Sequence, residues 1–70
     1  MEDIKIKFGQ RVRELRITKG YSQEKLAEIS DLDRTYIPSI EAGRRNASLV
    51  VVEKIAKAFN ITISELLNQL

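Results

Sequence analysis

Two short groups of polar side chains offer the chemistry in this sequence. The first is the run Arg34, Thr35 and Tyr36, and the second is the run 44–46, which holds two arginines and an asparagine. An arginine can donate two hydrogen bonds to guanine O6 and N7, and a threonine can bond a base edge or touch a thymine methyl. The alternative interpretation is an ordinary solvated surface, with Arg34 paired to a nearby acid such as Asp31.

The composition argues against catalysis and metal binding. The 70 residues include no histidine and no cysteine, which removes the usual general base near neutral pH and thiolate chemistry. No pair of carboxylates is evident on one helix face. A chain of this length forms one domain, spanning residues 1–70, whose small core leaves little room for an enclosed cavity. We expect no enzyme, no cofactor, no metal site and no small-molecule substrate.

Neither a membrane span nor an export signal is predicted. The longest apolar run is Leu49 to Val52, far short of the roughly 20 residues that cross a bilayer. The N-terminal segment MEDIKIKFG lacks the apolar region of a signal peptide. We expect a cytoplasmic protein with no membrane partner.

The charges are unevenly distributed along the chain. Residues 1–21 carry six basic and three acidic side chains, residues 22–43 carry two and five, and residues 44–57 carry four and one. Two basic segments can present a local basic surface to an anionic partner although the net charge is only +2. Solvated helix faces would give the same pattern.

Apolar residues recur mostly at helical spacing, which predicts an all-α protein. The expected helices cover about 3–19, 22–30, 33–42, 48–59 and 62–70. Ser22, Asp33 and Ser48 are suitable N-caps, and Thr62 with Glu65 matches a capping box. Short connections predict a compact five-helix orthogonal bundle.

Two of the expected helices show a clear apolar stripe. In the first helix the stripe includes Ile4 and Phe8, and in the fourth it includes Leu49 and Val52. Gly9 lies inside the first helix, where glycine costs about 1 kcal/mol relative to alanine. We therefore expect Gly9 to weaken that helix.

The second and third helices almost touch in the sequence. Two helices joined by three or four residues form a helix-turn-helix, which crosses at about 90–120°. Ala27 is small enough for the crossing, and Asp31 tolerates the left-handed backbone that the turn needs. The second helix of such a pair can enter a DNA major groove.

The chain from about Phe8 to Leu67 resembles the lambda-repressor-like helix-turn-helix family of phage repressors, Cro proteins and xenobiotic-response-element regulators. The matching elements are LR…KGYSQEKLA, YI..IEAGRR and IAKAFNITISELL, and LDRTYI followed by RRN resembles the controller proteins of restriction–modification systems. The resemblance implies a transcription regulator that binds a pseudo-palindromic operator in double-stranded DNA as a homodimer. It would control its own gene and the endonuclease gene, by blocking a promoter or by contacting RNA polymerase. Alternatives are a phage-type or Cro-like repressor, an antitoxin, or a protein-interaction module of the same fold.

Position and resemblance together assign the candidate site residues. The expected base contacts are Arg34, Thr35, Tyr36 and Ser39. The expected phosphate contacts are Ser22, Gln23, Arg44, Arg45 and Asn46. The resemblance also implies an ion pair between Arg16 and Glu41 that orients the third helix. The C-terminal apolar residues could cover the core or form the dimer interface: Ile61, Ile63, Leu66, Leu67 and Leu70.

The sequence departs from the family pattern at Asp31, where glycine is common, and at Pro38, where a small polar residue is usual. Proline has no N–H and crowds the carbonyl four residues before it. If the third helix starts at Asp33, Pro38 removes one hydrogen bond and kinks the helix. If it starts at Thr35, Pro38 lies in the first turn and removes nothing.

Overall fold

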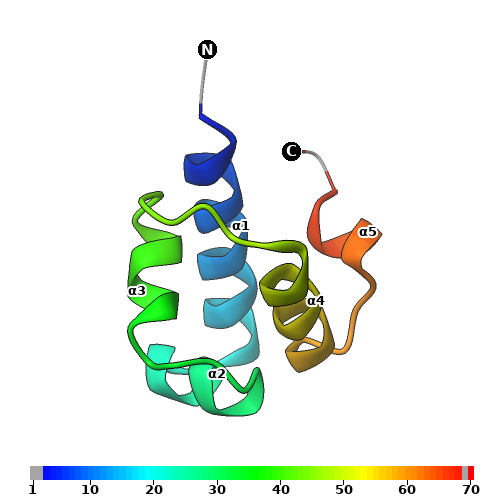
Figure 1. Ribbon diagram of the computed structural model, residues 1–70. Helices are drawn as coiled ribbons and strands as arrows, with labels where there is room; N and C mark the ends of the chain where they lie inside the picture. Colours follow the sequence, from blue (N-terminus) through cyan, green and yellow to red (C-terminus); the bar gives the residue numbers. More distant parts are fainter. Residues whose placement is uncertain (1–2, 69) are drawn as a thin grey trace.

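The computed structural model describes residues 3–68 and 70, and in this part of the chain the regular structure consists of five α-helices (Figure 1). They are α1 (Ile4–Lys19), α2 (Gln23–Ile29), α3 (Tyr36–Glu41), α4 (Leu49–Ala58) and α5 (Ile63–Leu66). The predicted all-α fold is confirmed. None of these helices is long and apolar enough to cross a membrane.

The helix ends follow the local signals in the sequence. The side chains of Asp3, Ser22 and Ser48 each accept a backbone N–H of the first turn that follows. Thr62 and Glu65 form the complete capping box at the start of α5. These bonds satisfy amide groups that the helices themselves leave without partners.

Helix α1 is the longest element, and the others lie around it (Figure 1). Helix α3 packs along one side of α1, α4 packs on α2 and α5, and α2 crosses below α3. One core lies between the helices, and it consists of Phe8, Val12, Leu26, Ala27, Ile37, Ile40, Val51, Val52, Ile55, Ala56, Phe59 and Leu66.

Gly9 has a role in the fold that helix propensity does not indicate. It is buried where α1 meets α3, and a Cβ atom at this position would overlap the carbonyl oxygen of Ile40 and lie 3.0 Å from that of Glu41. Only glycine allows the two backbones to come this close. The cost in helix propensity remains a prediction, and the contact between the two backbones gives the reason for glycine at this position.

Helices α3 and α5 are shorter than expected. Helix α3 begins at Tyr36 with Thr35 at the N-cap position, so Asp33 lies outside it. Helix α5 ends at Leu66 rather than near Leu70. Its end is held from α1, because Arg11 donates to the carbonyls of Glu65 and Leu66 at 2.8 and 3.1 Å.

Two apolar residues differ from their expected environment, and for a third the structure decides between two expected roles. Ile4 and Leu49 belong to the predicted stripes but are exposed, Leu49 at 80%. Leu66 is fully buried inside the chain, so of the two roles expected for it the structure shows the one in the core. The reason is geometric: the short α5 turns only one face to the core, and Leu66 occupies that face.

Candidate nucleic-acid interface

Helices α2 and α3 form the predicted helix-turn-helix. Asp31 adopts the left-handed backbone with φ of 56°, as expected for the turn. The N–H of Leu32 then donates to the carbonyl of Ala27 at 2.9 Å. Lys54 of α4 binds the same turn, with Nζ 3.3 Å from the Asp31 carbonyl and 3.8 Å from its carboxylate.

Pro38 is the third residue of α3 and therefore lies in its first turn. An N–H at this position would have no partner within the helix. Of the two alternatives that the sequence left open, the structure therefore shows the one in which Pro38 removes no helical hydrogen bond. Pro38 is also exposed.

The segment before α3 is held by Asp33. Its Oδ1 accepts the backbone N–H of Thr35 at 2.9 Å and the Thr35 hydroxyl at 2.8 Å. These two bonds lower the pKa of the Asp33 carboxyl, burial acts in the opposite direction, and the charges of Arg34 and Arg45 lower it further. Asp33 is therefore ionised at neutral pH.

Arg34 is exposed between Asp33 and Thr35. It forms no hydrogen bond or salt bridge with another side chain in residues 3–68 and 70. The suggested pairing with Asp31 is absent there, since Asp31 pairs with Lys54. The guanidinium therefore extends into solvent at the start of α3.

Tyr36, Ser39 and Arg45 form one connected cluster on α3. The guanidinium of Arg45 lies over the Tyr36 ring, 4.0 Å from its centre, a cation–π contact. Arg45 Nε also donates to the Ser39 hydroxyl at 2.9 Å. The Ser39 hydroxyl in turn donates to the carbonyls of Tyr36 and Thr35 at 2.9 and 3.1 Å. Arg45 is thus fixed against α3 although it belongs to the following loop.

Arg16 and Glu41 join α1 to α3, as the resemblance implied. Arg16 Nε lies 2.6 Å from Glu41 Oε2, and Nη2 lies 3.1 Å from Oε1. The side chains are only 14% and 6% exposed. Arg16 also donates to the carbonyl of Tyr21 at 2.9 Å. The bidentate pair and the further bond to the backbone offset the free-energy cost of burying the two charges.

The expected phosphate contacts occupy different environments. Gln23 is half-buried, and its Nε2 donates to Glu41 Oε1 at 3.2 Å, so the ion pair also orients this amide. Ser22 is the N-cap of α2. Arg44 and Asn46 are exposed in the loop after α3. These residues and Arg34 all lie on or beside the helix-turn-helix.

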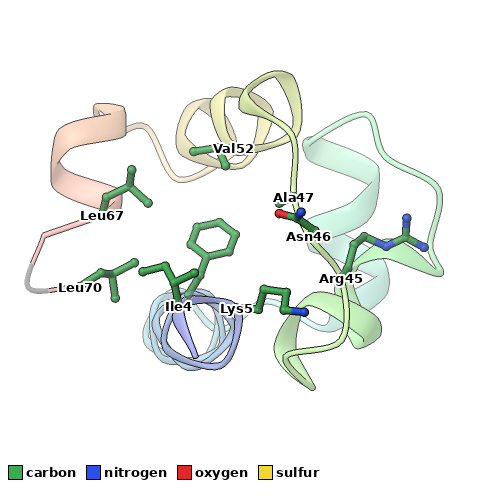
Figure 2. Close-up of a pocket in the computed structure, with 9 residues that line it drawn as sticks. Ile4, Lys5, Arg45, Asn46, Ala47, Val52, Leu67 and Leu70 are labelled. Atoms are coloured by element: carbon green, nitrogen blue, oxygen red, sulfur yellow. The ribbon is translucent and has the colours of Figure 1, made fainter. Parts of the chain in front are cut away.

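An apolar pocket of about 190 Å³ lies on another part of the molecule, between the start of α1, the 45–47 loop and the C-terminal residues (Figure 2). Leu67 and Leu70 line it together with Ile4 and Val52. Arg45 contributes only to its edge, and its guanidinium points away from the pocket (Figure 2). Leu70 and Ile61 pack partly against the core, while Ile63 and Leu67 are exposed.

Three features of the structure were not predicted from the sequence. The Asp33–Thr35 bonds could have been suggested by the spacing, because aspartate often accepts a backbone N–H two residues later. The contact of Arg45 with Tyr36, and the exposure of Leu49 and Val50, depend on the tertiary arrangement and leave no signal in the sequence.

Comparisons with known proteins agree with this geometry. The helix-turn-helix family profile matches residues 12–66. The control protein C.MunI from Mycoplasma sp. is 52% identical over 100% of this chain and 96% of its own length. The control protein C.BamHI from Bacillus amyloliquefaciens is 51% identical over 94% of this chain and 83% of its own length.

Solved structures give the same result. The restriction–modification controller protein C.AhdI from Aeromonas hydrophila superposes with a TM-score of 0.85 at 55% identity, over 89% of this chain and 94% of that protein. The biofilm regulator SinR in complex with DNA superposes with a TM-score of 0.81 at 34% identity, over 87% of this chain and 98% of that chain.

Proposed function

Because this chain belongs to the helix-turn-helix family of DNA-binding transcription regulators, we propose that it is the controller protein of a restriction–modification system. In this role it binds an operator near its own gene and regulates that gene together with the endonuclease gene. Operator DNA and promoters lie in the cytoplasm of a bacterium, so we place the protein there.

The observation that carries this proposal is the free guanidinium at the start of α3. Arg34 extends into solvent from the end of the helix that meets base edges in helix-turn-helix proteins. Two donors of one guanidinium match O6 and N7 of guanine. Arg45 adds a second cation that is already fixed on α3 by Tyr36 and Ser39.

Phosphate contacts would come from both sides of α3. Gln23 and Ser22 lie at the start of α2, and Arg44 and Asn46 lie in the loop after α3. Such contacts fix the position of a protein on the duplex without reading its sequence. We assign this role to these four residues, while Tyr36 and Ser39 support Arg45.

We further propose that the protein acts as a homodimer. Leu49 and Val50 are 80% and 62% exposed at the start of α4, which packs on α5. Ile63 and Leu67 of the C-terminal segment are also exposed. A second copy that covers these residues would bury apolar surface and give two recognition helices related by two-fold symmetry. Such a dimer suits a pseudo-palindromic site with half-sites about 34 Å apart.

Regulation would follow from occupancy of the operator. A bound dimer can block a promoter, and from a neighbouring site it can contact RNA polymerase and activate transcription. RNA polymerase is a partner of the protein only when the dimer activates transcription from a neighbouring site.

A fluorescence anisotropy titration at fixed salt tests the proposal. One probe is the duplex just upstream of the protein's own coding region, and the other is a scrambled duplex of equal length. We expect the upstream duplex to bind about 10³-fold more tightly. Equal and steeply salt-dependent binding to both probes would contradict regulation at its own gene.

Two variants that each remove one positive charge show whether the effect is specific to Arg34. Arg34→Ala should lower affinity for the upstream duplex about 10- to 100-fold and leave binding to the scrambled duplex nearly unchanged. Lys57→Ala removes an exposed cation of α4 and should behave like the wild type. Absence of binding to either duplex by the wild type would favour a protein-interaction module.

A further inference from the structure

The hydroxyl group of Thr35 is restricted in the hydrogen bonds that it can form with DNA. Its Oγ1 lies 2.8 Å from Asp33 Oδ1. An ionised carboxylate can only accept, so the hydroxyl must donate its single proton to Asp33. The Thr35 backbone N–H, at 2.9 Å from the same oxygen, holds the two residues in this geometry. Only the lone pairs of Oγ1 remain for an external partner.

We propose that Thr35 acts as a hydrogen-bond acceptor toward DNA and selects a base with an exocyclic amine, adenine or cytosine, at its position in the major groove. The inference rests on the proposed function, because it requires the start of α3 to meet base edges. Adenine N6 and cytosine N4 donate in the major groove, whereas guanine O6 and thymine O4 accept. An acceptor opposite an acceptor leaves both without a partner, which disfavours guanine and thymine.

The neighbouring side chains support an acceptor role for Thr35. Arg34 has donors only, so adjacent residues present opposite polarity to adjacent bases. Ser39 is also unable to donate to a base, because its hydroxyl donates to the backbone carbonyl of Tyr36 and accepts from Arg45. Among the hydroxyls of Thr35 and Ser39, Thr35 alone is exposed, and no donor from residues 3–68 or 70 binds its lone pairs.

A contact through the methyl group of Thr35 would instead select thymine. Its methyl group could touch the C5-methyl of thymine, a contact that needs no hydroxyl. The two uses differ in the preferred base and in their dependence on Asp33, so they can be separated experimentally.

The first experiment selects binding sites from a pool of random duplexes at fixed salt, with wild-type protein and with Thr35→Val. Valine keeps the shape of threonine and lacks the hydroxyl. The position at which the base preference differs between the two proteins is the position that Thr35 contacts. We expect adenine or cytosine there for the wild type and no such preference for Thr35→Val.

The second experiment removes only the amine of the base. In the selected duplex, adenine at that position is replaced by purine, or cytosine by 2-pyrimidinone. We expect wild-type affinity to fall about 3- to 10-fold more than the affinity of Thr35→Val. Because both proteins bind the same altered duplex, any change in the duplex itself cancels. This comparison needs no variant of Asp33.

The third experiment releases the hydroxyl proton. Asp33→Ala should reduce the preference for an amine at this position to less than about twofold, since the hydroxyl can then donate or accept. Asp31→Asn removes the same charge from the neighbouring turn without touching Thr35, and should change the affinity for all bases equally. Thermal melting checks that both variants are folded.

Three results would overturn the inference: thymine or guanine at the Thr35 position, an unchanged base preference in Thr35→Val, or equal binding of the wild type to duplexes with and without the amine. With any of them, strong selection of a defined site would leave the proposed function intact. If the wild type selects no sequence at all, the proposed function fails, and the inference fails with it.

Discussion

At the residue scale, Gly9 and Glu41 determine how α3 is attached to α1. One provides space for the backbone and the other provides a buried charge pair. Neither role depends on DNA, so both can be tested on the isolated protein.

Gly9→Ala should destabilise the protein by about 3 kcal/mol, because the added methyl group overlaps the Ile40 carbonyl and overpacking of this kind costs about 1–3 kcal/mol or more. Helix propensity alone predicts the opposite, a gain of about 1 kcal/mol. Urea unfolding measures the change. Gln10→Ala, at the exposed neighbouring position of α1, serves as the control and should lie within about 0.5 kcal/mol of the wild type. A more stable Gly9→Ala protein would show that the two backbones do not meet as described.

Glu41→Gln should cost about 3–5 kcal/mol, because it leaves the Arg16 guanidinium buried without its counter-charge. Urea unfolding at pH 7 measures this change too. Glu53→Gln is the matched control, since Glu53 forms an exposed pair with Lys57 at 3.9 Å and should contribute less than about 1 kcal/mol. Similar effects of the two substitutions would contradict a special role for the Arg16–Glu41 pair.

The residue scale is also where prediction from sequence was least complete. The Arg16–Glu41 pair was available only through resemblance to a family, and the contact of Gly9 with the backbone of α3 was not predicted. Both features depend on which backbones meet across the core, and local propensity contains no information about such contacts.

At the element scale, the N-cap residues predict where most of the helices begin. Helices α2, α4 and α5 begin where the sequence predicted, at Ser22, Ser48 and the Thr62–Glu65 capping box. Asp33 was the exception, since it caps no helix and instead binds Thr35, so that α3 starts later. An aspartate can hold a turn as readily as a helix end, and the sequence does not distinguish the two.

The capping box predicts a pH dependence for α5. The N–H and hydroxyl of Thr62 lower the pKa of the Glu65 carboxyl below its ordinary value. Because the folded pKa is the lower one, the contribution of Glu65 to stability is fully present above the unfolded pKa and is lost as pH falls through the folded pKa. An NMR titration of the Thr62 amide proton should therefore show a step below the ordinary glutamate range. Glu65→Gln should abolish this step, and a step at the ordinary pKa in the wild type would contradict the capping box.

At the scale of the whole molecule, the all-α fold was predictable, because the apolar residues recur at helical spacing and short connections allow few arrangements of five helices. The family was predictable only through its resemblance to known proteins. The surface that we propose for a second copy could be predicted only in part. Leu66 and Leu67 are adjacent in the sequence, yet one is buried in the core and the other is exposed. The stripe of α4 included Leu49, which the packing leaves 80% exposed. Which apolar residues remain outside a small core is decided only when all helices are in place.

The proposed dimer leads to a prediction at this scale. Leu49→Ser should raise the dissociation constant of the dimer about 10-fold or more, because burial of a leucine contributes about 1.5–3 kcal/mol and two-fold symmetry places it on both subunits. The folded monomer should be nearly unaffected, since Leu49 is exposed. Sedimentation equilibrium measures association and thermal melting measures folding. Ile17→Ser, at an exposed position of α1, should leave association unchanged. Equal association of wild type and Leu49→Ser would exclude this surface.

The contact at Gly9 has a consequence for how mutational tolerance should be interpreted. In a library in which every position is randomised and survival requires operator binding, position 9 should be as restricted as Arg34, although Gly9 is buried against Ile40 and Arg34 extends into solvent. Selection for function alone would place both residues in one class. A parallel selection for cellular abundance should separate them, because variants at position 9 would disappear from both pools and variants of Arg34 only from the first.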